Sequence, residues 1–427
     1  MSVDEAQREG PLAPYRVLDL ADDKGAMCGK MFADLGADVI MIEPPEGAPT
    51  RRIPPFLEGR HGLERGLYHL SYAAGKRSVT LDLRQAMGRR LFVQLVETAD
   101  FLVESYPIGY LDELGLGYES LAARNPRLIQ ASITPFGDKG PGARWKAADI
   151  VTWAAGGMMF LTGHPGRPPL QISLPQAGLH AGAEAAVSSM LAHLERERSG
   201  RGQRIVIDMQ ACVAWTLLNE TGFPILHGDF MRRSGTTIGS RDVARKTVFR
   251  CADGFVTLVL SGADYALHTA HELVRWMDEE GAAPDWVKVV DFSDWTATRF
   301  TTRATPELMQ EVWDCEAVVE SFLERHTRRE IYNEALKRNL LIAPVATVED
   351  IATDEQLGAR GYFQSVEFPA VGRELTVPGP FALLSASPAG KPRPAPTLGQ
   401  HNRAVLCGEL AVEPDHLPHL FAEGVIS

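Results

Sequence analysis

The stretch that decides the fold spans residues 16–43 and reads RVLDLADDKGAMCGKMFADLGADVIMIE. Val17–Leu20 is a short apolar run typical of a buried strand, and Val39–Ile42 is a second run of the same kind. Between them, Gly29–Leu35 carries apolar side chains at helical spacing. Parallel strands need a crossover of this sort to connect them. The stretch therefore predicts a strand, a helix and a second strand parallel to the first.

The same alternation continues along the chain. A long helix is predicted at Ala181–Arg198, with small residues in its first half and charged residues in its second, before the helix stop Ser199-Gly200. Repeated alternation of strand and helix predicts an α/β fold, in which a doubly wound parallel sheet carries helices on both faces. The further predicted strands are Ser78–Leu83, Phe101–Glu104, Leu128–Ile133 and Ile205–Asp208, and the further predicted helix is Gln85–Thr98.

The length of 427 residues is too great for one compact core, so two domains are expected. After Asn219 the composition changes, and charged amphipathic helices that follow a turn and an apolar strand predict a smaller α+β domain. Beyond Leu341, short strands and proline-rich connections return. We therefore expect residues 1–219 to form the N-terminal part of the large domain, 220–345 a linker and the small domain, and 346–427 a return segment and the C-terminal part of the large domain.

Charge and composition narrow the class of protein. The formal net charge is −12, with 55 acidic and 43 basic residues, which argues against nucleic acids and anionic membranes as partners. The sequence has no apolar run of membrane-spanning length, and its N-terminal residues lack a signal-peptide core. The five cysteines are widely separated and never form a C-x-x-C pair, as is typical of reduced thiols. We expect a cytoplasmic protein with neither a membrane nor a nucleic-acid partner.

Three cationic patches occur at ends of the predicted strands or helices. Lys76-Arg77 precedes a strand, Arg51-Arg52 follows a proline-rich turn, and Arg144 and Lys146 lie in a loop after Gly140-Pro141-Gly142. Each patch on its own could be a pair of solvated charges. Together, on one α/β sheet, they indicate an anionic ligand that carries phosphate.

Several other kinds of site are not indicated. The turn Ala21–Gly29 lacks the G-x-G-x-x-G spacing that dinucleotide cofactors need. His268 and His271 have helical i, i+3 spacing but no third ligand nearby in sequence, so we predict no zinc or other metal. The sequence contains neither a G-x-S-x-G motif nor a cysteine placed beside a histidine, so it does not indicate a hydrolase. We expect no covalently bound cofactor.

The order of motifs resembles the family III CoA-transferases from about residue 15 to residue 410. This resemblance implies a doubly wound large domain with a smaller domain, two chains interlocked like links of a chain, and coenzyme A or acyl-CoA as substrate or ligand. The motifs that carry it are Val17-Leu18-Asp19, Ala33–Ile40, Ile42-Glu43-Pro44, Gly75–Ser78, Leu81-Asp82-Leu83, Ala99-Asp100, Val103-Glu104, Leu114-Gly115-Leu116, Asn125-Pro126, Phe136-Gly137, Gly140-Pro141, Gly200–Gln203, Asp208, Ala343-Pro344-Val345, Pro380-Phe381 and Leu398–His401.

The resemblance also implies which side chains bind CoA. It assigns this role to Lys76, Arg77 and Lys146, with Arg51 as a weaker candidate. Family members often carry asparagine at two further positions, where this chain has Ala73 and Ser105. CoA contacts from those two positions are therefore in doubt.

The catalytic position departs from the family pattern. Family III enzymes use an aspartate, whose carboxylate attacks the acyl-CoA thioester to give an anhydride and then an aspartyl-CoA thioester. Leu161-Thr162-Gly163 and Pro168-Pro169 fix the register, which places the nucleophile at Gly178. The histidine of the related racemase branch is Ala148 here. We therefore predict no catalytic residue in this chain. The candidates that could substitute are Glu184, His180 and Asp149, each of which also has an ordinary structural explanation.

Three functions are compatible with these observations. Arg275–Gly281 resembles a branch of the family that is built from two different subunits, transfers CoA between succinyl-CoA and benzylsuccinate, and serves aromatic degradation. The first hypothesis is a structural or CoA-binding subunit of such a heteromeric enzyme, inactive alone, whose partner is a homologous subunit with the catalytic aspartate. The second is a non-catalytic homodimer that binds CoA esters. The third is an autonomous CoA-transferase with an unusual carboxylate nucleophile.

Overall fold

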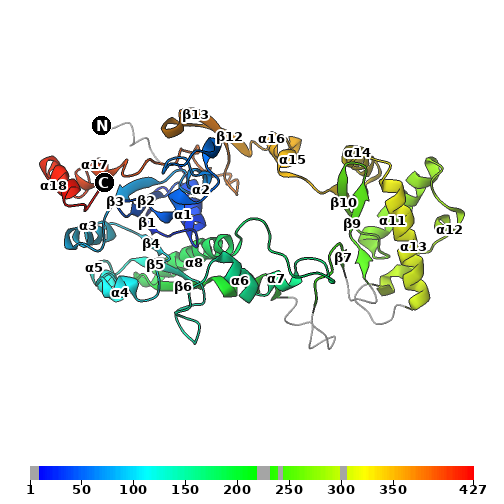
Figure 1. Cartoon of the computed structure of the whole chain (residues 1–427), viewed down its shortest axis with the longest axis horizontal. Helices are drawn as coiled ribbons and strands as arrows, with labels where there is room; N and C mark the ends of the chain where they lie inside the picture. The colour runs from blue at the N-terminus through cyan, green and yellow to red at the C-terminus, as the bar shows by residue number, and fades with distance from the viewer. Residues whose placement is uncertain (1–8, 219–230, 239–243, 299–304) are drawn as a thin grey trace. The chain divides into compact units, whose positions relative to one another are not determined.

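A computed structural model describes residues 9–218, 231–238, 244–298 and 305–427. The chain divides into two compact units. The first comprises Met1–Met158, Ile172–Leu218 and Glu355–Ser427, and the second comprises Met159–Gln171 and Asn219–Asp354. The first unit thus contains both the blue N-terminal and the red C-terminal segments in Figure 1. The chain passes from the first unit to the second at 218/219 and returns at 354/355, whereas the expected boundaries were 219/220 and 345/346. The second unit also includes Met159–Gln171, a short segment around residue 165.

The first unit is built on a six-stranded sheet in the order β3-β2-β1-β4-β5-β6, and all of its strand pairs are parallel. In the centre of the sheet, Asp19 of β1 lies opposite Met41 of β2 and Val103 of β4. The predicted doubly wound parallel sheet is confirmed. The strands are β1 Arg16–Leu20, β2 Asp38–Glu43, β3 Arg77–Thr80, β4 Phe101–Glu104, β5 Ile129–Thr134 and β6 Arg204–Asp208.

Helices cover both faces of this sheet. On one face, Phe101 of β4 contacts Phe32 of α1, with ring centroids 5.0 Å apart, and the guanidinium of Arg196 from α8. On the other face, Leu18 and Ile40 belong to a buried cluster with side chains of α3, α5, α17 and α18. These helices are α1 Ala26–Asp34, α3 Ala86–Val96, α5 Tyr118–Arg124, α8 Ala177–Ser199, α17 Asn402–Leu406 and α18 Leu417–Ala422. The first unit also contains α2 Leu67–Tyr72, α4 Tyr110–Glu113, α6 Asp149–Ala155, α9 Met209–Trp215 and α16 Glu355–Ala359.

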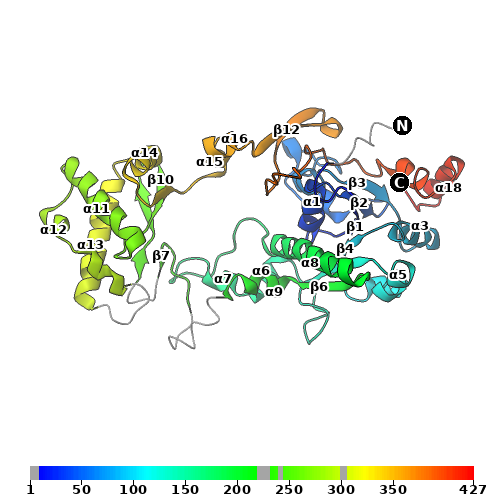
Figure 2. The ribbon, with the colours of Figure 1, turned by 180° about the vertical axis from the view of Figure 1, so that it is seen from behind.

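The C-terminal segment covers the outer edge of β3. The backbone N–H of Ser78 donates to Nδ1 of His401 at 3.0 Å, and the N–H of His401 donates back to the carbonyl of Ser78 at 2.9 Å. The N–H of Thr80 donates to Oδ1 of Asn402 at 2.8 Å. Figure 1 places α17 beside β3, and in the view from behind the red C-terminal segment lies next to β3 (Figure 2). A segment from the end of the chain therefore satisfies edge groups that a seventh strand would otherwise pair. A two-stranded antiparallel hairpin, β12 Phe363–Phe368 and β13 Arg373–Pro378, precedes this segment.

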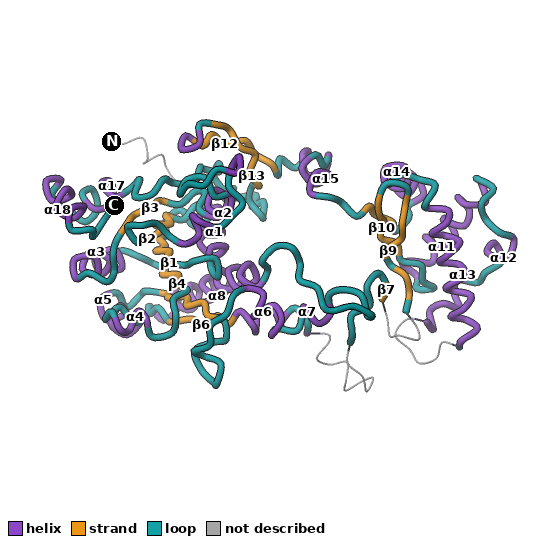
Figure 3. Tube along the Cα trace, viewed as in Figure 1, coloured by secondary structure: helices purple, strands orange, loops and turns teal. Residues whose placement is uncertain are grey.

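The second unit is an α+β body with its own core. Its antiparallel strands β9 Val248–Cys251, β10 Gly254–Leu258 and β11 Ile342–Pro344 form one sheet beside the long helices α11 Asp264–Glu279 and α13 Pro306–Leu323 (Figure 3). Phe249, Val256 and Trp276 are among its buried residues. The predicted smaller α+β unit is confirmed. Its shorter elements are α12 Asp285–Lys288, α14 Arg328–Arg338, α15 Val348–Ala352, β7 Thr237–Ile238 and β8 Arg245–Lys246.

Arg233 links the short segment around residue 165 to the second unit. Its guanidinium donates to the backbone carbonyls of Phe160, His164 and Arg167 at 2.9–3.2 Å.

Within the described residues, no helix is both long and apolar enough to cross a bilayer. Nor do the described residues hold a cluster of three side chains suited to a metal ion. Of the two histidines considered for zinc, the ring of His268 contacts the carbonyl of Arg338, and that of His271 packs on Phe292.

Candidate functional site

Lys76, a predicted CoA ligand, lies inside the first unit. Its ammonium donates to Oδ2 of Asp19 at 2.7 Å and to the carbonyl of Ala26 at 3.3 Å, and both charged side chains are almost fully buried. Helix α1 approaches this pair closely at Gly29, where an added Cβ would lie 2.1 Å from the Asp19 carboxylate. A buried charge without its partner is very costly, so the two charges hold each other in place.

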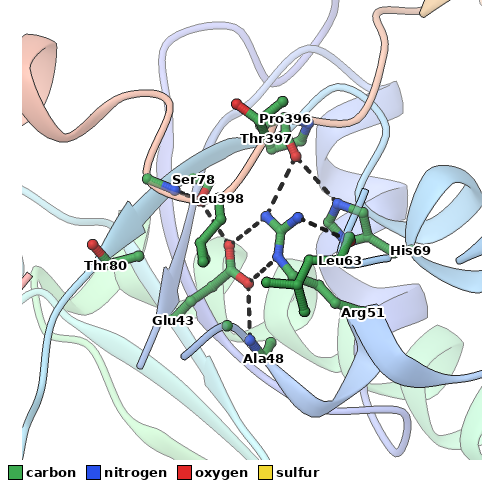
Figure 4. Close-up of polar contacts among 12 residues, drawn as sticks. Glu43, Ala48, Arg51, Leu63, His69, Ser78, Thr80, Pro396, Thr397 and Leu398 are labelled. Atoms are coloured by element: carbon green, nitrogen blue, oxygen red, sulfur yellow. Dashed lines mark hydrogen bonds and ion pairs between the residues drawn. The ribbon is translucent and has the colours of Figure 1, made fainter. Parts of the chain in front are cut away.

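Arg51, the weaker CoA candidate, is also fully buried and has several internal partners (Figure 4). Its Nε and one terminal nitrogen donate to the two carboxylate oxygens of Glu43 at 2.6 and 2.8 Å. Its remaining donors reach the Glu64 carboxylate at 2.7 Å and the carbonyls of Leu63 and Pro396. Burial would raise the pKa of Glu43, but the hydrogen bonds and charge of Arg51 hold it below its usual value. The bidentate geometry is the strong form of this ion pair.

His69 and Ser78 complete this buried network. Nε2 of His69 contacts the carbonyl of Pro396 at 3.2 Å, whereas its buried Nδ1 has no hydrogen-bond partner among the described residues. The hydroxyl of Ser78 donates to Glu43 at 2.6 Å and accepts the N–H of Gly399. Figure 4 shows Glu43, Arg51 and His69 grouped beneath the return segment at Pro396. The network therefore fastens the C-terminal part of the chain to β2 and β3.

Arg77 is partly buried and belongs to a four-residue charge cluster. Its guanidinium donates to both carboxylate oxygens of Asp38 and to Glu409, at 2.5–2.9 Å. Arg16 pairs with the same two carboxylates, at 2.9 and 2.8 Å. Like Arg51 and Lys76, Arg77 is thus engaged by carboxylates of its own chain.

Lys146 differs from the other three predicted CoA ligands. It lies in the loop between β5 and α6 and is exposed, beside the exposed ring of Trp145. Trp145 packs edge-on against Phe136, with ring centroids 5.8 Å apart. Among the described residues, no carboxylate forms an ion pair with Lys146. Of the four cations, it is the one whose charge is open to an incoming phosphate.

Gly178, the position predicted for the nucleophile, lies in the first turn of α8, which begins four residues earlier than predicted. An added Cβ would lie 2.7 Å from the backbone carbonyl oxygen of Asp23 and 3.4 Å from the Cα of Lys24. At Gly182, one helical turn further on, an added Cβ would lie 2.7 Å from the side chain of Met27. The buried face of α8 is therefore made of small residues so that α1 and its preceding loop can pack closely on it.

Asp149 caps the helix that carries Gly178. One carboxylate oxygen accepts the backbone N–H of Gly178 at 3.0 Å, and the other accepts the N–H of Gln176 at 3.1 Å. The first N–H groups of a helix lack intrahelical partners, and a carboxylate at this end is favoured by the helix dipole. Asp149 is thus brought to Gly178, but its oxygens are occupied by this structural role.

The other two candidate substitutes point elsewhere. The ring of His180 stacks on Trp153 of α6, with centroids 6.1 Å apart. Glu184 is half-buried near α9, where burial, followed by the charges of Glu184 and Asp208, raises the pKa of Cys212 to about 12.

The loop that faces Gly178 contains carboxylates that our sequence analysis did not single out. Asp22 accepts a hydrogen bond from the Ser105 hydroxyl at 2.7 Å and pairs with Lys24. Burial, followed by the charges of Asp22 and other neighbours including Asp149, raises the pKa of Asp23, although the residue as a whole is exposed. The pair Asp22-Asp23, one residue after the end of a buried strand, was a signal that could have identified this loop.

Comparison with known proteins places the chain. The model of CoA-transferase family III matches residues 12–402. The chain belongs to this family. Among its relatives is succinyl-CoA:(R)-benzylsuccinate CoA-transferase subunit BbsE of Thauera aromatica. The two sequences are 35% identical over 94% of this chain and 96% of the relative. Succinyl-CoA–D-citramalate CoA-transferase of Chloroflexus aurantiacus is 32% identical over 97% of this chain and 98% of its own length.

Solved structures agree with this assignment. A CAIB/BAIF family protein from Brucella suis superposes with a TM-score of 0.77 at 28% identity, over 94% of this chain and all of that one. The resemblance read from the ordered motifs is therefore confirmed as family membership, together with its α/β fold.

Proposed function

We propose that this chain is the subunit of a heteromeric family III CoA-transferase that lacks the nucleophile, and that its homologous partner subunit carries the catalytic aspartate. The complex would transfer CoA between succinyl-CoA and a carboxylic acid such as benzylsuccinate, in the cytoplasm. The observation that carries the proposal is Gly178, which has no side chain and no room for one against Asp23. The likeness to a relative whose name describes a subunit supports the partner role.

The geometry of α8 argues against rescue by a nearby residue. Each helical residue turns the side-chain direction by about 100°, so Glu184 points about 120° away from the direction of Gly178, and His180 about 160° away. Asp149 is held by two backbone N–H groups. A nucleophile displaced by an ångström loses orders of magnitude in rate. We therefore infer that this subunit does not form the aspartyl anhydride or the aspartyl-CoA thioester.

We propose that Lys146 contacts the phosphates of CoA, since its charge is exposed. Lys76, Arg77 and Arg51 would act on CoA only by shaping the surrounding loops, because their charges are paired with Asp19, Asp38 and Glu43. An interlocked pair of the two subunits, as the family resemblance implies, would bring the partner's aspartate to acyl-CoA. The five cysteines are all free thiols, which is consistent with a reducing cytoplasm.

The test compares the purified chain with and without a homologous subunit that has aspartate at the position of Gly178. Succinyl-CoA and benzylsuccinate are supplied, and formation of benzylsuccinyl-CoA is followed by chromatography. We expect transfer with the mixture and none with this chain alone. Hydroxylamine trapping during turnover should then modify only the partner subunit. Transfer by the isolated chain, or a hydroxamate on it, contradicts the proposal.

A second candidate function is an autonomous CoA-transferase in which Asp23 is the unusual nucleophile. Its backbone carbonyl faces Gly178, and burial, followed by the charge of Asp22, raises the pKa of its carboxyl although the residue is exposed. In this case the Asp23 carboxylate would attack the thioester carbonyl and CoA thiolate would leave, giving an anhydride. The isolated wild-type chain would then turn over and be labelled by hydroxylamine at Asp23, and Asp23→Asn would lose both properties while Asp22→Asn keeps the label.

A further inference from the structure

Residues Met159–Gln171 form a loop that we call the strap. The chain leaves the first unit after Met158, runs through the strap as part of the second unit, and re-enters the first unit at Ile172. None of the residues in the strap is buried, and Phe160 and Leu170 are 51 and 55% exposed. A segment without buried side chains belongs to the least stable part of a fold. The attachment of the strap to the second unit therefore depends mainly on polar contacts.

Arg233 makes most of these contacts. All three nitrogens of its guanidinium donate to carbonyls of the strap. Nε contacts His164 at 3.2 Å and Arg167 at 3.1 Å, and the terminal nitrogens contact Phe160 at 3.2 Å and Arg167 at 2.9 Å. The guanidinium also lies over the ring of Phe160, 5.6 Å from its centroid, where a cation is attracted by the aromatic face. One side chain thus supplies four hydrogen bonds to the strap.

The backbone next to Arg233 joins the strap to the sheet of the second unit. The N–H of Gly235 donates to the carbonyl of Gly163 in the strap at 3.1 Å. The next carbonyl along the chain, that of Thr236, accepts the N–H of Val248 at the start of β9 at 3.3 Å. The residues that hold the strap are therefore themselves fixed to the body of the second unit.

The acceptors of Arg233 make this contact easier to open than the buried ion pairs of the first unit. No carboxylate pairs with Arg233 among the described residues, and the side chain is only half-buried. Hydrogen bonds to neutral carbonyls are weaker than a bidentate bond to a carboxylate, as in the pair of Arg51 and Glu43. Because water reaches the guanidinium, opening leaves no buried charge without a partner.

We propose that Arg233 is a latch that controls whether the strap is attached to the second unit. With the latch closed, the chain crosses between the units four times, at 158/159, 171/172, 218/219 and 354/355. With the latch open, the strap becomes a loop of the first unit, and only the last two crossings remain. The second unit then moves more freely relative to α8, which begins six residues after the strap. The inference goes beyond the proposed function, because it depends neither on CoA nor on a partner subunit.

Amide hydrogen exchange of the isolated chain tests the latch. Arg233→Ala should raise the exchange rate of strap amides by about tenfold or more, since the open state becomes more populated. A suitable amide is that of Leu170, which donates to the carbonyl of Thr162 at 3.0 Å. Arg232→Ala, at the exposed neighbour, is the matched control and should leave the rate unchanged.

The amides of β9 and β10 show whether the effect is confined to the strap, and they should exchange at the wild-type rate in both variants. Equal strap exchange in the two variants would show that Arg233 is not a latch. Faster exchange in β9 and β10 as well as in the strap would mean that Arg233 supports the whole second unit, which also overturns the proposal.

Chemical rescue tests the geometry of the latch. Millimolar guanidinium, added to Arg233→Ala, should restore slow exchange in the strap, because it carries the planar set of donors that the carbonyls accept. Ammonium at the same concentration has the same charge without this geometry and should have no effect. Restoration by neither ion, or by both equally, would contradict the assignment of the carbonyls as a guanidinium site.

Spin labels measure the consequence for the two units. They are attached at Leu194→Cys on α8 and Leu336→Cys on α14, which are 66 and 65% exposed. The background is Cys212→Ser, Cys407→Ser, because these two cysteines are not fully buried. The labelled chain is diluted with unlabelled chain, so that distances within one chain are counted. Arg233→Ala should broaden the distance distribution and the control variant should not. An unchanged distribution would overturn the proposal even if exchange in the strap increases.

Discussion

Arg51 and Lys146 are both cations that follow strands of the same parallel sheet, Arg51 in a short 3-10 helix after β2 and Lys146 in the loop after β5, but their surroundings are opposite. Arg51 is enclosed by Glu43, Glu64 and two backbone carbonyls, whereas Lys146 is exposed and, among the described residues, without an ion-pair partner. A cation next to a strand end can therefore serve either the fold or a ligand. What separates the two cases is whether the chain supplies its own carboxylate.

The largest expected effect on stability comes from removing the charge of Arg51. Arg51→Leu leaves the Glu43 carboxylate buried without its cation, which should lower the free energy of unfolding by about 3–5 kcal/mol. The measurement is urea denaturation followed by circular dichroism. Arg52→Leu, at the exposed neighbour, is the matched control and should cost less than about 1 kcal/mol. If Arg51→Leu costs no more than Arg52→Leu, the network does not stabilise the fold.

The pH dependence of stability tests the same buried network. Burial, followed by the charge of Arg51, lowers the pKa of His69 to about 4, while a histidine in an unfolded chain titrates near 6.5. The unfolded state therefore binds the extra proton between these values, so the contribution of His69 is complete above about pH 6.5 and is lost as the pH falls toward 4. The loss should reach on the order of 3 kcal/mol.

The measurement is the free energy of unfolding at pH 7 and pH 5 for the wild type and for His69→Gln. The variant should show a smaller decrease than the wild type over this interval. His419→Gln, at an exposed histidine, should follow the wild type. Equal slopes for all three proteins would show that His69 is not held neutral by its surroundings.

Gly178 extends the comparison to a position where the packing leaves no space for a side chain. Gly178→Ala forces a methyl group to within 2.7 Å of the Asp23 carbonyl oxygen and should destabilise the chain by about 1–3 kcal/mol. Gly358→Ala, in α16 with open space around it, is the control and should be neutral or slightly stabilising. Thermal unfolding measures both. A neutral Gly178→Ala would mean that the loop at Asp23 yields readily and that a side chain could be accommodated there.

The smallest effect on stability is expected at Lys146. Lys146→Ala should leave the free energy of unfolding within about 0.5 kcal/mol of the wild type and weaken CoA binding about tenfold, through loss of a charge-assisted contact with phosphate. Titration calorimetry with CoA measures the affinity, and Lys139→Ala in the same exposed loop is the control. Equal affinities of the two variants would remove Lys146 from the site.

The sheet could be predicted from sequence because its signals are local. The apolar runs at residues 17–20 and 39–42 both form strands, and the helix between them is present, although it begins at Ala26, three residues before the predicted start. The start of α8 could not be predicted in the same way. It is set by the Asp149 carboxylate, which lies 27 and 29 residues before the N–H groups it accepts. Long-range pairing of this kind leaves no periodic signal in the chain.

The structural roles of the predicted CoA ligands could not be predicted either, because their partners lie far away in the sequence. Lys76 meets Asp19 across 57 residues, and Arg51 meets the Pro396 carbonyl across 345. One signal for the first pair was present, since Asp19 is a charged residue within the apolar run Val17–Leu20 and a buried charge needs a partner.

The cover that residues 401–402 form over β3 has a consequence for how the protein is made. During synthesis β3 emerges early, but His401 and Asn402 follow it by roughly 320 residues. At about 5–20 residues per second, the open edge of the nascent sheet waits on the order of half a minute for its cover. An uncovered strand edge is a template for pairing with other chains. The ribosome-bound chain therefore passes through an interval in which a chaperone would have its greatest value.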